Sequence, residues 1–295
     1  MKIIITGSLG HISKPLAEEL ITKGHIVTVI SSNLSKKQAI EALGAIAAIG
    51  SMEDVDFLSE TFANADAIYC MVPPADYNEP DRRIFYSRIA KNYVQAISKS
   101  SIKRVIHLSS FGADLDKGTG IILGAFDAEN IFNALENVNL THIRPTYFYY
   151  NLNNFINAIK FADVIKANYG GDSKFPLVAP ADIAEATAEE IQNLDSVNKI
   201  RYVSSNECSG NEIASVLGAA IGKPDLKWVL ISNEEVQNSL ESYGMPAQLA
   251  AGFVDMFDSM HKGDLSRDFY LHHPTKLGKV KLENFAKDFV IAYNQ

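Results

Sequence analysis

The first twenty-three residues constrain the fold more than any other part of the sequence. Residues 1–6 form a short, β-branched apolar run that predicts a buried strand. A glycine turn over residues 7–13 follows directly, and residues 14–23 then carry apolar side chains at helical spacing. Gly7 allows a tight turn, and Gly10 removes a side chain where the backbone would approach a pyrophosphate. A strand, a glycine turn and a helix in this order predict a dinucleotide-binding unit.

The glycine turn is predicted to hold the phosphates of the dinucleotide. Its third glycine position is occupied by Ser13, which is small enough to let the helix pack on the strand. His11 lies inside the turn, and we expect its backbone N–H group to face a phosphate oxygen. The residues of this segment that we predict to bind the cofactor are Gly7, Leu9, Gly10, His11 and Ile12.

The end of the second predicted strand, at residues 25–30, bears on the choice between NAD and NADP. An acidic residue there would accept a hydrogen bond from the ribose 2′-hydroxyl of NAD. The sequence instead has hydroxyl, amide and amine side chains, at Ser31, Ser32, Asn33, Lys36 and Lys37. These groups suit a 2′-phosphate, so we include the first four in the cofactor site and expect NADP, with NAD as the alternative. A second interpretation is compatible with the first: Ser32 or Asn33 caps the following helix, and the lysines are solvated.

Strands and helices alternate along the first half of the chain. Further strands are predicted at residues 45–49, 65–72, 103–108 and 140–143, and helices at residues 34–43, 54–62, 80–100 and 125–135. Six strands separated by helices with short links predict an α/β fold with a doubly wound parallel sheet of the Rossmann type. A chain of 295 residues, 47% of them hydrophobic, can bury a large core.

The second half of the chain predicts a smaller C-terminal α/β lobe. Helices are predicted at residues 182–194, 210–221, 234–241, 246–260 and 280–293, strands at 199–204 and 226–231, and a loop at 263–278. We place the NAD(P)-binding domain at residues 1–150. The lobe for a substrate or partner takes residues 151–295, and we expect it to interleave with the first domain rather than to stand apart.

The carboxyl ends of the predicted strands extend the cofactor site beyond the glycine turn. Ligands of an open parallel sheet bind at that edge. The residues at or just past the ends of the third to sixth strands complete the predicted site: Ser51, Met71, Val72, Pro73, Ser109, Ser110 and Pro145.

Several of these segments resemble one protein family. The similar segments are Thr6-Gly7-x-x-Gly10, residues 66–74, residues 105–113, Glu129, Ile143-Arg144-Pro145, residues 178–184 and residues 209–214. Together they resemble the NmrA-like branch of the atypical short-chain dehydrogenase/reductases over nearly the whole chain. The resemblance implies a Rossmann-type NAD(P) domain with a small lobe lying over the cofactor.

The sequence departs from catalytic short-chain enzymes in one respect. Those enzymes use a Tyr-x-x-x-Lys pair, in which the lysine lowers the pKa of the tyrosine. No lysine of this chain has a tyrosine four residues before it, and the positions expected from Glu129, Ile121 and Ala125, are apolar. Two residues remain as catalytic candidates. Ser109 would hydrogen-bond a carbonyl, and Tyr147, two residues beyond Pro145, would orient the substrate with its phenol.

Three functions are compatible with these observations. The first is an NADP(H)-dependent oxidoreductase acting on a small carbonyl or quinone-like substrate, with hydride transfer achieved mostly by positioning. The second is a non-catalytic redox sensor that binds NAD(P) and a regulatory protein, which the missing Tyr-x-x-x-Lys pair favours. The third is a nucleotide-sugar epimerase-like enzyme, which is weakened because such enzymes depend on the same tyrosine.

Composition argues against other classes. The net charge of −8, with no basic cluster longer than a pair, argues against a nucleic-acid partner. No apolar run reaches membrane-spanning length, and the histidines and two cysteines show no metal-ligand spacing. The N-terminus is already the first predicted core strand, so we expect no signal peptide and a cytoplasmic protein without a membrane partner.

Overall fold

The computed structural model describes the whole chain except residues 77, 78, 80 and 275. Its contacts divide the chain into two units that interleave along the sequence. The first unit comprises Met1–Ala113, Gly124–Arg144 and Ile183–Arg201, and the second comprises Asp114–Leu123, Pro145–Asp182 and Tyr202–Gln295. The predicted boundary was at residue 150, whereas the chain passes from the first unit to the second at Arg144 and Pro145, and Ile183–Arg201, which we placed in the lobe, belongs to the first unit.

A seven-stranded sheet forms the centre of the first unit, with the order β10-β6-β5-β4-β1-β2-β3. Its strands are β1 (Lys2–Ile5), β2 (Ile26–Ser31), β3 (Ile46–Ile49), β4 (Ala67–Met71), β5 (Arg104–Leu108), β6 (Asn139–Pro145) and β10 (Ile200–Val203). All neighbours from β6 to β3 pair in parallel. The strand order reverses between β1 and β4, so the predicted doubly wound parallel sheet is confirmed.

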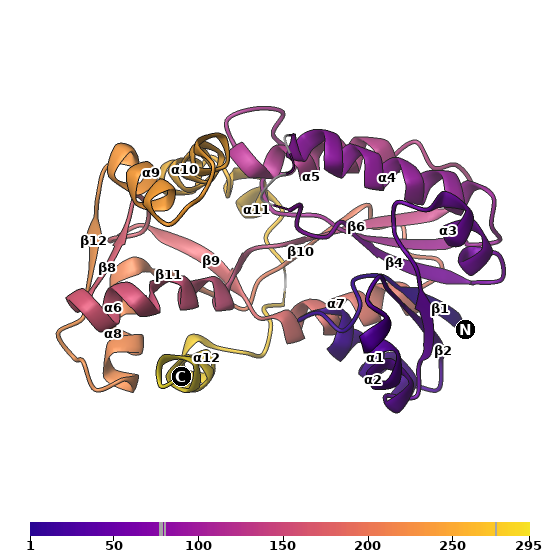
Figure 1. The fold of residues 1–295 in the computed structure, drawn as a ribbon, viewed down its shortest axis with the longest axis horizontal. Coiled ribbons are helices and arrows are strands. Elements are labelled where there is room, and N and C mark those ends of the chain that lie inside the picture. The colour runs from indigo at the N-terminus through magenta and orange to yellow at the C-terminus, as the bar shows by residue number, and fades with distance from the viewer. Residues whose placement is uncertain (77–78, 80, 275) are drawn as a thin grey trace. The chain divides into compact units, whose positions relative to one another are not determined.

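Helices cover both faces of this sheet. They are α1 (Ser13–Thr22), the 3₁₀ helix η1 (Leu34–Lys36), α2 (Lys37–Ala42), α3 (Val55–Phe62), α4 (Arg82–Ser98), α5 (Leu123–Phe132) and α7 (Pro180–Gln192). Figure 1 shows α3, α4 and α5 on one face and α1, α2 and α7 on the other. Side chains of Asp54 and Asp81 cap α3 and α4 by accepting hydrogen bonds from first-turn N–H groups. The predicted start of the α4 helix at Pro80 lies outside the described residues.

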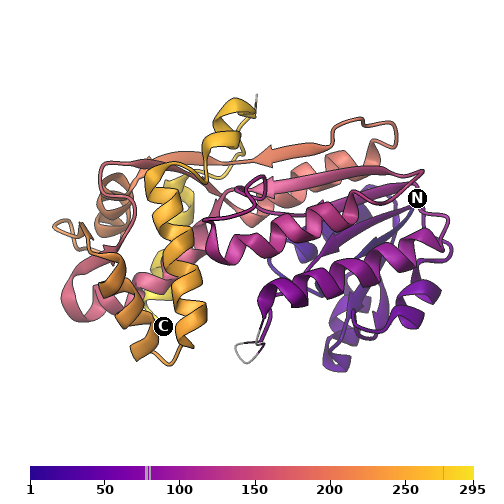
Figure 2. The same cartoon turned by 90° about the horizontal axis from the view of Figure 1, so that it is seen from above.

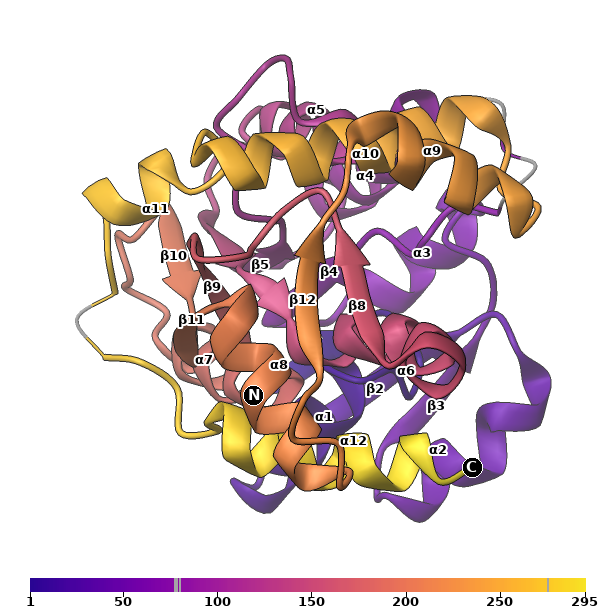
Figure 3. The ribbon, with the colours of Figure 1, turned by 90° about the vertical axis from the view of Figure 1, so that its left-hand side faces the viewer.

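The second unit contains two small sheets. One has the order β11-β9-β7, with β7 (Tyr147–Phe148), β9 (Lys174–Val178) and β11 (Asn206–Ser209). The other pairs β8 (Val164–Ala167) with β12 (Lys227–Leu230) in parallel, as Figure 3 shows. The helices are η2 (Gly120–Ile122), η3 (Tyr149–Phe155), α6 (Ile156–Ala162), α8 (Gly210–Ala220), α9 (Asn233–Ser242), α10 (Ala247–Lys262), α11 (Arg267–Leu271) and α12 (Leu282–Tyr293).

The prediction of a loop over residues 263–278 is wrong in part, because α11 lies within it. Phe269 is 1% exposed and packs against Tyr202 at a ring distance of 5.6 Å, and Leu265, just before the helix, is also 1% exposed. Tertiary burial of these two side chains therefore stabilises a short helix in a segment that also contains charged residues, two histidines and a proline.

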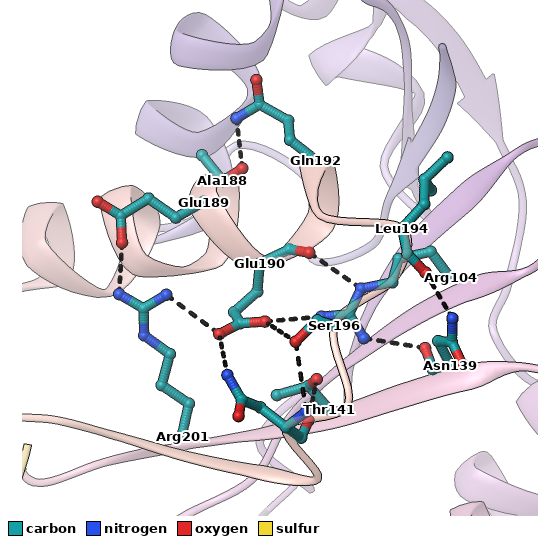
Figure 4. Close-up of polar contacts among 11 residues, drawn as sticks. Arg104, Asn139, Thr141, Ala188, Glu189, Glu190, Gln192, Leu194, Ser196 and Arg201 are labelled. Carbon is teal, nitrogen blue, oxygen red and sulfur yellow. Dashed lines mark hydrogen bonds and ion pairs between the residues drawn. The ribbon is translucent and has the colours of Figure 1, made fainter.

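A buried ion pair between Arg104 and Glu190 connects Ile183–Arg201, the last of the three stretches of the first unit, to the central sheet (Figure 4). Arg104, at the start of β5, is fully buried and donates to Glu190 Oε2 at 2.8 Å and to the Glu190 carbonyl at 2.9 Å. Its third bond goes to the carbonyl of Asn139 at 3.0 Å. Ser196 and Arg201 also donate to the Glu190 carboxylate. This network lies at the amino end of β5, opposite the edge at which ligands of such sheets bind.

Candidate functional site

The glycine turn after β1 has two positions at which a side chain would collide with its neighbours or cover the backbone. Gly7 has φ +89°, and a Cβ there would lie 2.7 Å from Ser13 Oγ and 2.9 Å from Met71 Cγ. Gly10 N–H donates to the Gly7 carbonyl at 3.2 Å, and a Cβ on Gly10 would approach that carbonyl to 3.1 Å. The first position admits only glycine, and the second leaves the backbone uncovered.

Ser13 holds helix α1 against the sheet, although glycine is usual at this position. Its hydroxyl is buried and donates to the Thr6 carbonyl at 2.8 Å. The Thr6 hydroxyl in turn accepts from Met71 N–H at 2.8 Å, which joins β1 to the end of β4. These two bonds replace the close contact that a third glycine would permit. The sequence predicted that serine is tolerated here but not that it forms this bond.

The N-terminus of α1 is available to an anion. No side chain of the described residues caps it at Ile12, and its first turn contains no acidic residue. Gly10 and His11, directly before it, are exposed. Lys14 N–H donates to the Gly10 carbonyl at 3.0 Å and Pro15 has no N–H, so the N–H groups of Ile12 and Ser13 remain for a ligand. Together with the positive dipole end of a ten-residue helix, they favour a negative ligand at this point.

The end of β2 confirms the capping interpretation for Asn33. The Asn33 side chain accepts from Ser35 N–H at 2.9 Å and begins η1. Ser31 is 2% exposed, and its hydroxyl accepts from Ser8 Oγ at 2.9 Å and from Asn33 N–H at 3.2 Å. Ser31 therefore fixes the glycine turn to the end of β2, whereas Ser32 and Lys36 are exposed beside it.

Strand direction brings the other first-unit candidates to the same edge of the sheet. Ser51 follows β3, Met71 ends β4 and Ser110 follows β5, so all lie at the carboxyl edge with the glycine turn. The remaining candidates there are Val72 and Pro73, next to Met71. Pro145 ends β6 and belongs to the second unit.

Ser109 is engaged in a buried ion pair. Arg144 donates through Nε and Nη2 to the two carboxylate oxygens of Glu129, at 2.9 and 2.7 Å. The Ser109 hydroxyl donates to the same carboxylate at 2.5 Å, and all three residues are less than 10% exposed. A carboxylate held by an arginine only accepts, so the Ser109 proton points at Glu129. The catalytic role of Ser109 stays a prediction. A charged residue inside an apolar strand, Arg144, was the available sequence signal for this pair.

Two histidines, His107 and His142, lie two residues before Ser109 and Arg144 and are also buried. His107 and His142 face each other on β5 and β6, with their Nδ1 atoms 2.9 Å apart. His142 Nε2 lies 3.2 Å from Asn133 Oδ1, an acceptor, so we assign the His142 proton to Nε2 and the shared proton to His107 Nδ1. Burial lowers the pKa of both, that of His142 to about 4, and mutual repulsion further lowers that of His107.

This pair predicts a loss of stability in mild acid. The folded-state pKa values lie below the ordinary value of about 6.5, so the unfolded chain binds more protons below pH ~6.5. Stability contributed by neutral His142 is present above pH ~6.5 and declines as the pH falls towards about 4. We expect His142→Gln to remove about 2 kcal/mol of the acid-induced loss between pH 7.5 and 5, measured by urea unfolding at both values. The exposed His273→Gln should leave that difference unchanged, and an unchanged difference in His142→Gln would contradict the assignment.

Tyr147 lies in the second unit and is more buried than the sequence suggested. It is 6% exposed on β7, and its hydroxyl lies 2.8 Å from that of Tyr169. Burial raises its pKa to about 12. Phe148, the next residue, is only half-buried and stacks on Tyr150 at a ring distance of 5.1 Å. The two-residue alternation of β7 turns Tyr147 inward and Phe148 outward.

The first unit also has a groove that is separate from the predicted cofactor residues. It has a volume of about 770 Å³ and lies between α4 and α5, which run side by side in Figure 2. None of its lining residues is a predicted cofactor residue. The Arg83–Asp127 ion pair, with bonds of 2.6 and 2.7 Å, crosses it. Among the described residues, none of the helices is both long and apolar enough to span a bilayer, and no three His, Cys, Asp or Glu residues are placed to hold a metal.

Comparison with known proteins identifies similar chains. Residues 1–284 match the NmrA-like family. An NAD(P)H azoreductase of Xenophilus azovorans is 21% identical over 257 residues, which cover 86% of each chain. The crystal structure of an NADPH-dependent quinone oxidoreductase of Escherichia coli in complex with NADPH is 20% identical, with a TM-score of 0.82, over 97% of this chain and 99% of that one. Triphenylmethane reductase of Citrobacter in complex with NADP(H) is 19% identical, with a TM-score of 0.80, over 97% and 99%.

Proposed function

Because this chain belongs to the NmrA-like family, we propose that it is an NADPH-dependent oxidoreductase that reduces a small carbonyl or quinone-like compound. The observation that carries the proposal is the uncapped N-terminus of α1 behind the glycine turn, at the carboxyl edge of a doubly wound sheet. The names of the azoreductase, the quinone oxidoreductase and the triphenylmethane reductase support a reductase of small conjugated compounds.

The residues of the first unit fit a dinucleotide. The backbone at Gly10 and the first turn of α1 would hold the pyrophosphate, because no side chain covers them and the helix dipole favours an anion. Met71, Val72 and Ser110 lie at the ends of β4 and β5, on the nicotinamide side of the point where the strand order reverses. When bound, the reduced nicotinamide supplies the hydride for the reduction.

The end of β2 supports NADP over NAD. The position at which an acid would bind the 2′-hydroxyl is taken by Ser31, whose hydroxyl is already bonded to Ser8 and Asn33. Ser32 and Lys36 are exposed next to it and offer a hydroxyl and a positive charge to a 2′-phosphate.

Changing Ser32 to aspartate should shift the preference from NADP towards NAD. A carboxylate repels the 2′-phosphate and accepts from a 2′-hydroxyl, so we expect the ratio of the two dissociation constants to change by about 10- to 100-fold. Isothermal titration calorimetry with both cofactors measures this ratio. Ser239→Asp makes the same substitution at an exposed serine of α9, outside the proposed site, and is the matched control. An unchanged ratio in Ser32→Asp would assign the 2′-phosphate to other residues.

Tyr147 is the proposed proton donor to the substrate oxygen. Its phenol is protonated at neutral pH, because burial raises its pKa to about 12, so it acts as an acid and not as a base. The chain has no Tyr-x-x-x-Lys pair to supply this proton in the usual way. The Ser109 hydroxyl donates its hydrogen bond to the Glu129 carboxylate, so in this arrangement it does not also donate to a substrate carbonyl, and its oxygen remains as an acceptor.

A quinone assay with two variants tests the function. Purified protein with NADPH and a panel of small quinones and aldehydes should lose absorbance in the reduced-nicotinamide band. Tyr147→Phe should lower kcat by about 100-fold and leave the NADPH dissociation constant unchanged. Tyr270→Phe removes another hydroxyl of the second unit, which bonds to Glu207, and should leave kcat unchanged. Equal turnover in Tyr147→Phe and the parent would exclude Tyr147, and no turnover by the parent would favour a non-catalytic NAD(P)-binding protein.

A further inference from the structure

Ser109 is the most exposed member of the cluster that it forms with Glu129 and Arg144 in the first unit. Arg144 and Glu129 are 3% and 5% exposed, whereas Ser109 is 9% exposed. Ser109 directly follows β5, and its backbone N–H donates to the Ile143 carbonyl at 2.8 Å. This bond fixes the residue at the carboxyl edge of the sheet, where ligands of doubly wound sheets bind. The Ser109 hydroxyl is therefore the part of the cluster that a ligand of this edge would meet first.

The hydrogen bonds of the cluster determine what this hydroxyl offers to a ligand. Arg144 donates to both carboxylate oxygens of Glu129, the arrangement of an ionised carboxylate and an arginine. An ionised carboxylate only accepts, so the 2.5 Å bond from Ser109 Oγ to Glu129 Oε1 uses the one proton of the hydroxyl. In the part of the chain that the structure describes, no donor binds Ser109 Oγ. The oxygen therefore keeps its capacity to accept and has no second proton to give.

The nicotinamide end of the proposed cofactor contains one group that matches such an acceptor. A ribose hydroxyl either donates or accepts, and the carboxamide oxygen only accepts, whereas the carboxamide nitrogen carries two N–H groups and only donates. Ser109 follows Leu108, which pairs with Met71 at the end of β4, on the nicotinamide side of the point where the strand order reverses. An acceptor without a free proton at this place favours the carboxamide nitrogen.

We propose that Ser109 accepts a hydrogen bond from the carboxamide N–H of the nicotinamide, and that Glu129, held by Arg144, is the positioning residue that directs the serine proton away from it. The inference rests on the proposed function and assigns one contact within its cofactor site. It replaces the contact expected from the sequence, in which Ser109 donates to a carbonyl. A carboxamide held through its nitrogen also limits the rotation of the nicotinamide ring, which serves a reaction that depends on positioning.

Three oxidised cofactors test this contact by calorimetry, without turnover: NADP⁺, its 3-acetylpyridine analogue and its thionicotinamide analogue. The first analogue has a methyl group in place of the carboxamide NH₂, and the second keeps the NH₂ but has sulfur in place of the carbonyl oxygen. We expect the parent to bind the acetylpyridine analogue about 10-fold more weakly than NADP⁺, because Ser109 Oγ loses its donor. The thionicotinamide analogue should bind within about 3-fold of NADP⁺, because its N–H groups remain.

Two variants assign the preference to these residues. Ser109→Ala should bind NADP⁺ about 10-fold more weakly than the parent and no longer distinguish it from the acetylpyridine analogue. In Glu129→Gln the new amide can donate to Ser109 Oγ and so release the serine proton, so the preference should fall below about 3-fold. A purely structural role of Glu129 would lower the melting temperature without changing this preference. Ser109→Ala keeps the ion pair of Glu129 and Arg144, so the test does not depend on the folding of Glu129→Gln.

Ser196 provides the matched control, because it makes the same kind of bond at the opposite edge of the sheet. It is also buried and donates at 2.9 Å to the Glu190 carboxylate, which Arg104 holds at the amino end of β5. Ser196→Ala therefore removes a hydroxyl from an equivalent buried cluster, far from the carboxyl edge. It should leave the dissociation constants of all three cofactors unchanged.

The outcomes separate this contact from the function on which it rests. Equal affinities of the parent for NADP⁺ and the acetylpyridine analogue would overturn the contact. Selective loss of the thionicotinamide analogue would show that Ser109 donates to the carbonyl, and an equal loss of all three cofactors in Ser109→Ala would assign its hydroxyl to a ribose oxygen. A full preference in Glu129→Gln would overturn the role of Glu129. Each of these results leaves the reductase function intact, whereas a parent that binds none of the three cofactors would overturn that function and the contact with it.

Discussion

Replacing Gly10 with aspartate is expected to raise the dissociation constant for NADPH by at least about 100-fold, close to abolishing binding. A Cβ at this position approaches the Gly7 carbonyl to 3.1 Å, so the glycine turn has to shift. The carboxylate also stands at the N-terminus of α1, where the dipole and the open N–H groups would otherwise receive the pyrophosphate. Calorimetry with NADPH measures the change.

Two further variants divide this effect into its causes. Gly10→Ala adds the Cβ without the charge, so we expect a smaller loss of about 10-fold. Ala247→Asp adds the same charge at the exposed first residue of another helix, α10, and should leave the NADPH affinity unchanged. If Gly10→Asp binds NADPH as tightly as the parent, the cofactor phosphates do not lie on this turn.

Removing Arg104 should have the largest effect on stability. Arg104→Ala leaves the Glu190 carboxylate buried without its main partner and leaves two backbone carbonyls without a donor. Loss of one member of a buried ion pair typically costs about 3–5 kcal/mol. We expect a loss of this size in the free energy of unfolding, measured by urea denaturation of the parent and the variant.

A surface ion pair provides the matched control. Arg267 and Asp264 lie 2.6 Å apart with both side chains exposed, so Arg267→Ala should cost less than about 1 kcal/mol. Because Arg104 lies at the amino end of β5, the folded fraction of Arg104→Ala should keep its NADPH affinity. A loss no greater than that of Arg267→Ala would show that the network in Figure 4 adds little stability.

The fold of the first unit could be predicted because its strands are apolar and its links are short. The predicted strand at residues 65–72 is β4, and every residue of β4 from Ala67 to Cys70 is buried. In a chain where strands and helices alternate, a continuous apolar run of this length is typical of a buried parallel strand. The glycine turn was equally clear, since Gly7 and Gly10 occupy positions where a side chain would collide or cover the backbone.

In the second unit the predicted strand at residues 226–231 is β12, but β9 and β11 could not be predicted in the same way. β11 has the sequence Asn-Glu-Cys-Ser, which shows no apolar alternation. β9 contains Pro176, a residue that is normally evidence against a strand between two neighbours, yet β9 pairs with both β11 and β7. These strands are stabilised by tertiary contacts, which the local sequence does not encode.

The hydrogen-bond and ion-pair partners of the polar site residues also could not be predicted from the sequence. Glu129 and Arg144 stand out as charges in apolar segments, but their spacing does not show that they bind each other or that Ser109 joins them. The burial of Tyr147 depends on Tyr169 and Phe175, which come from a later part of the chain. A sequence can show that a polar group needs a partner, but the fold selects which one.

The late segment Ile183–Arg201 has a consequence for folding on the ribosome. The first unit is made of three stretches, and its sheet gains β10 only after nearly 200 residues have been synthesised. Until Glu190 emerges, the nascent chain holds Arg104 without the carboxylate that neutralises it. Most domains fold from the N-terminus as each is completed. We therefore expect the first hundred residues to reach their full stability only after this segment has been synthesised, and a chain that ends before Glu190 to be less stable than the full chain.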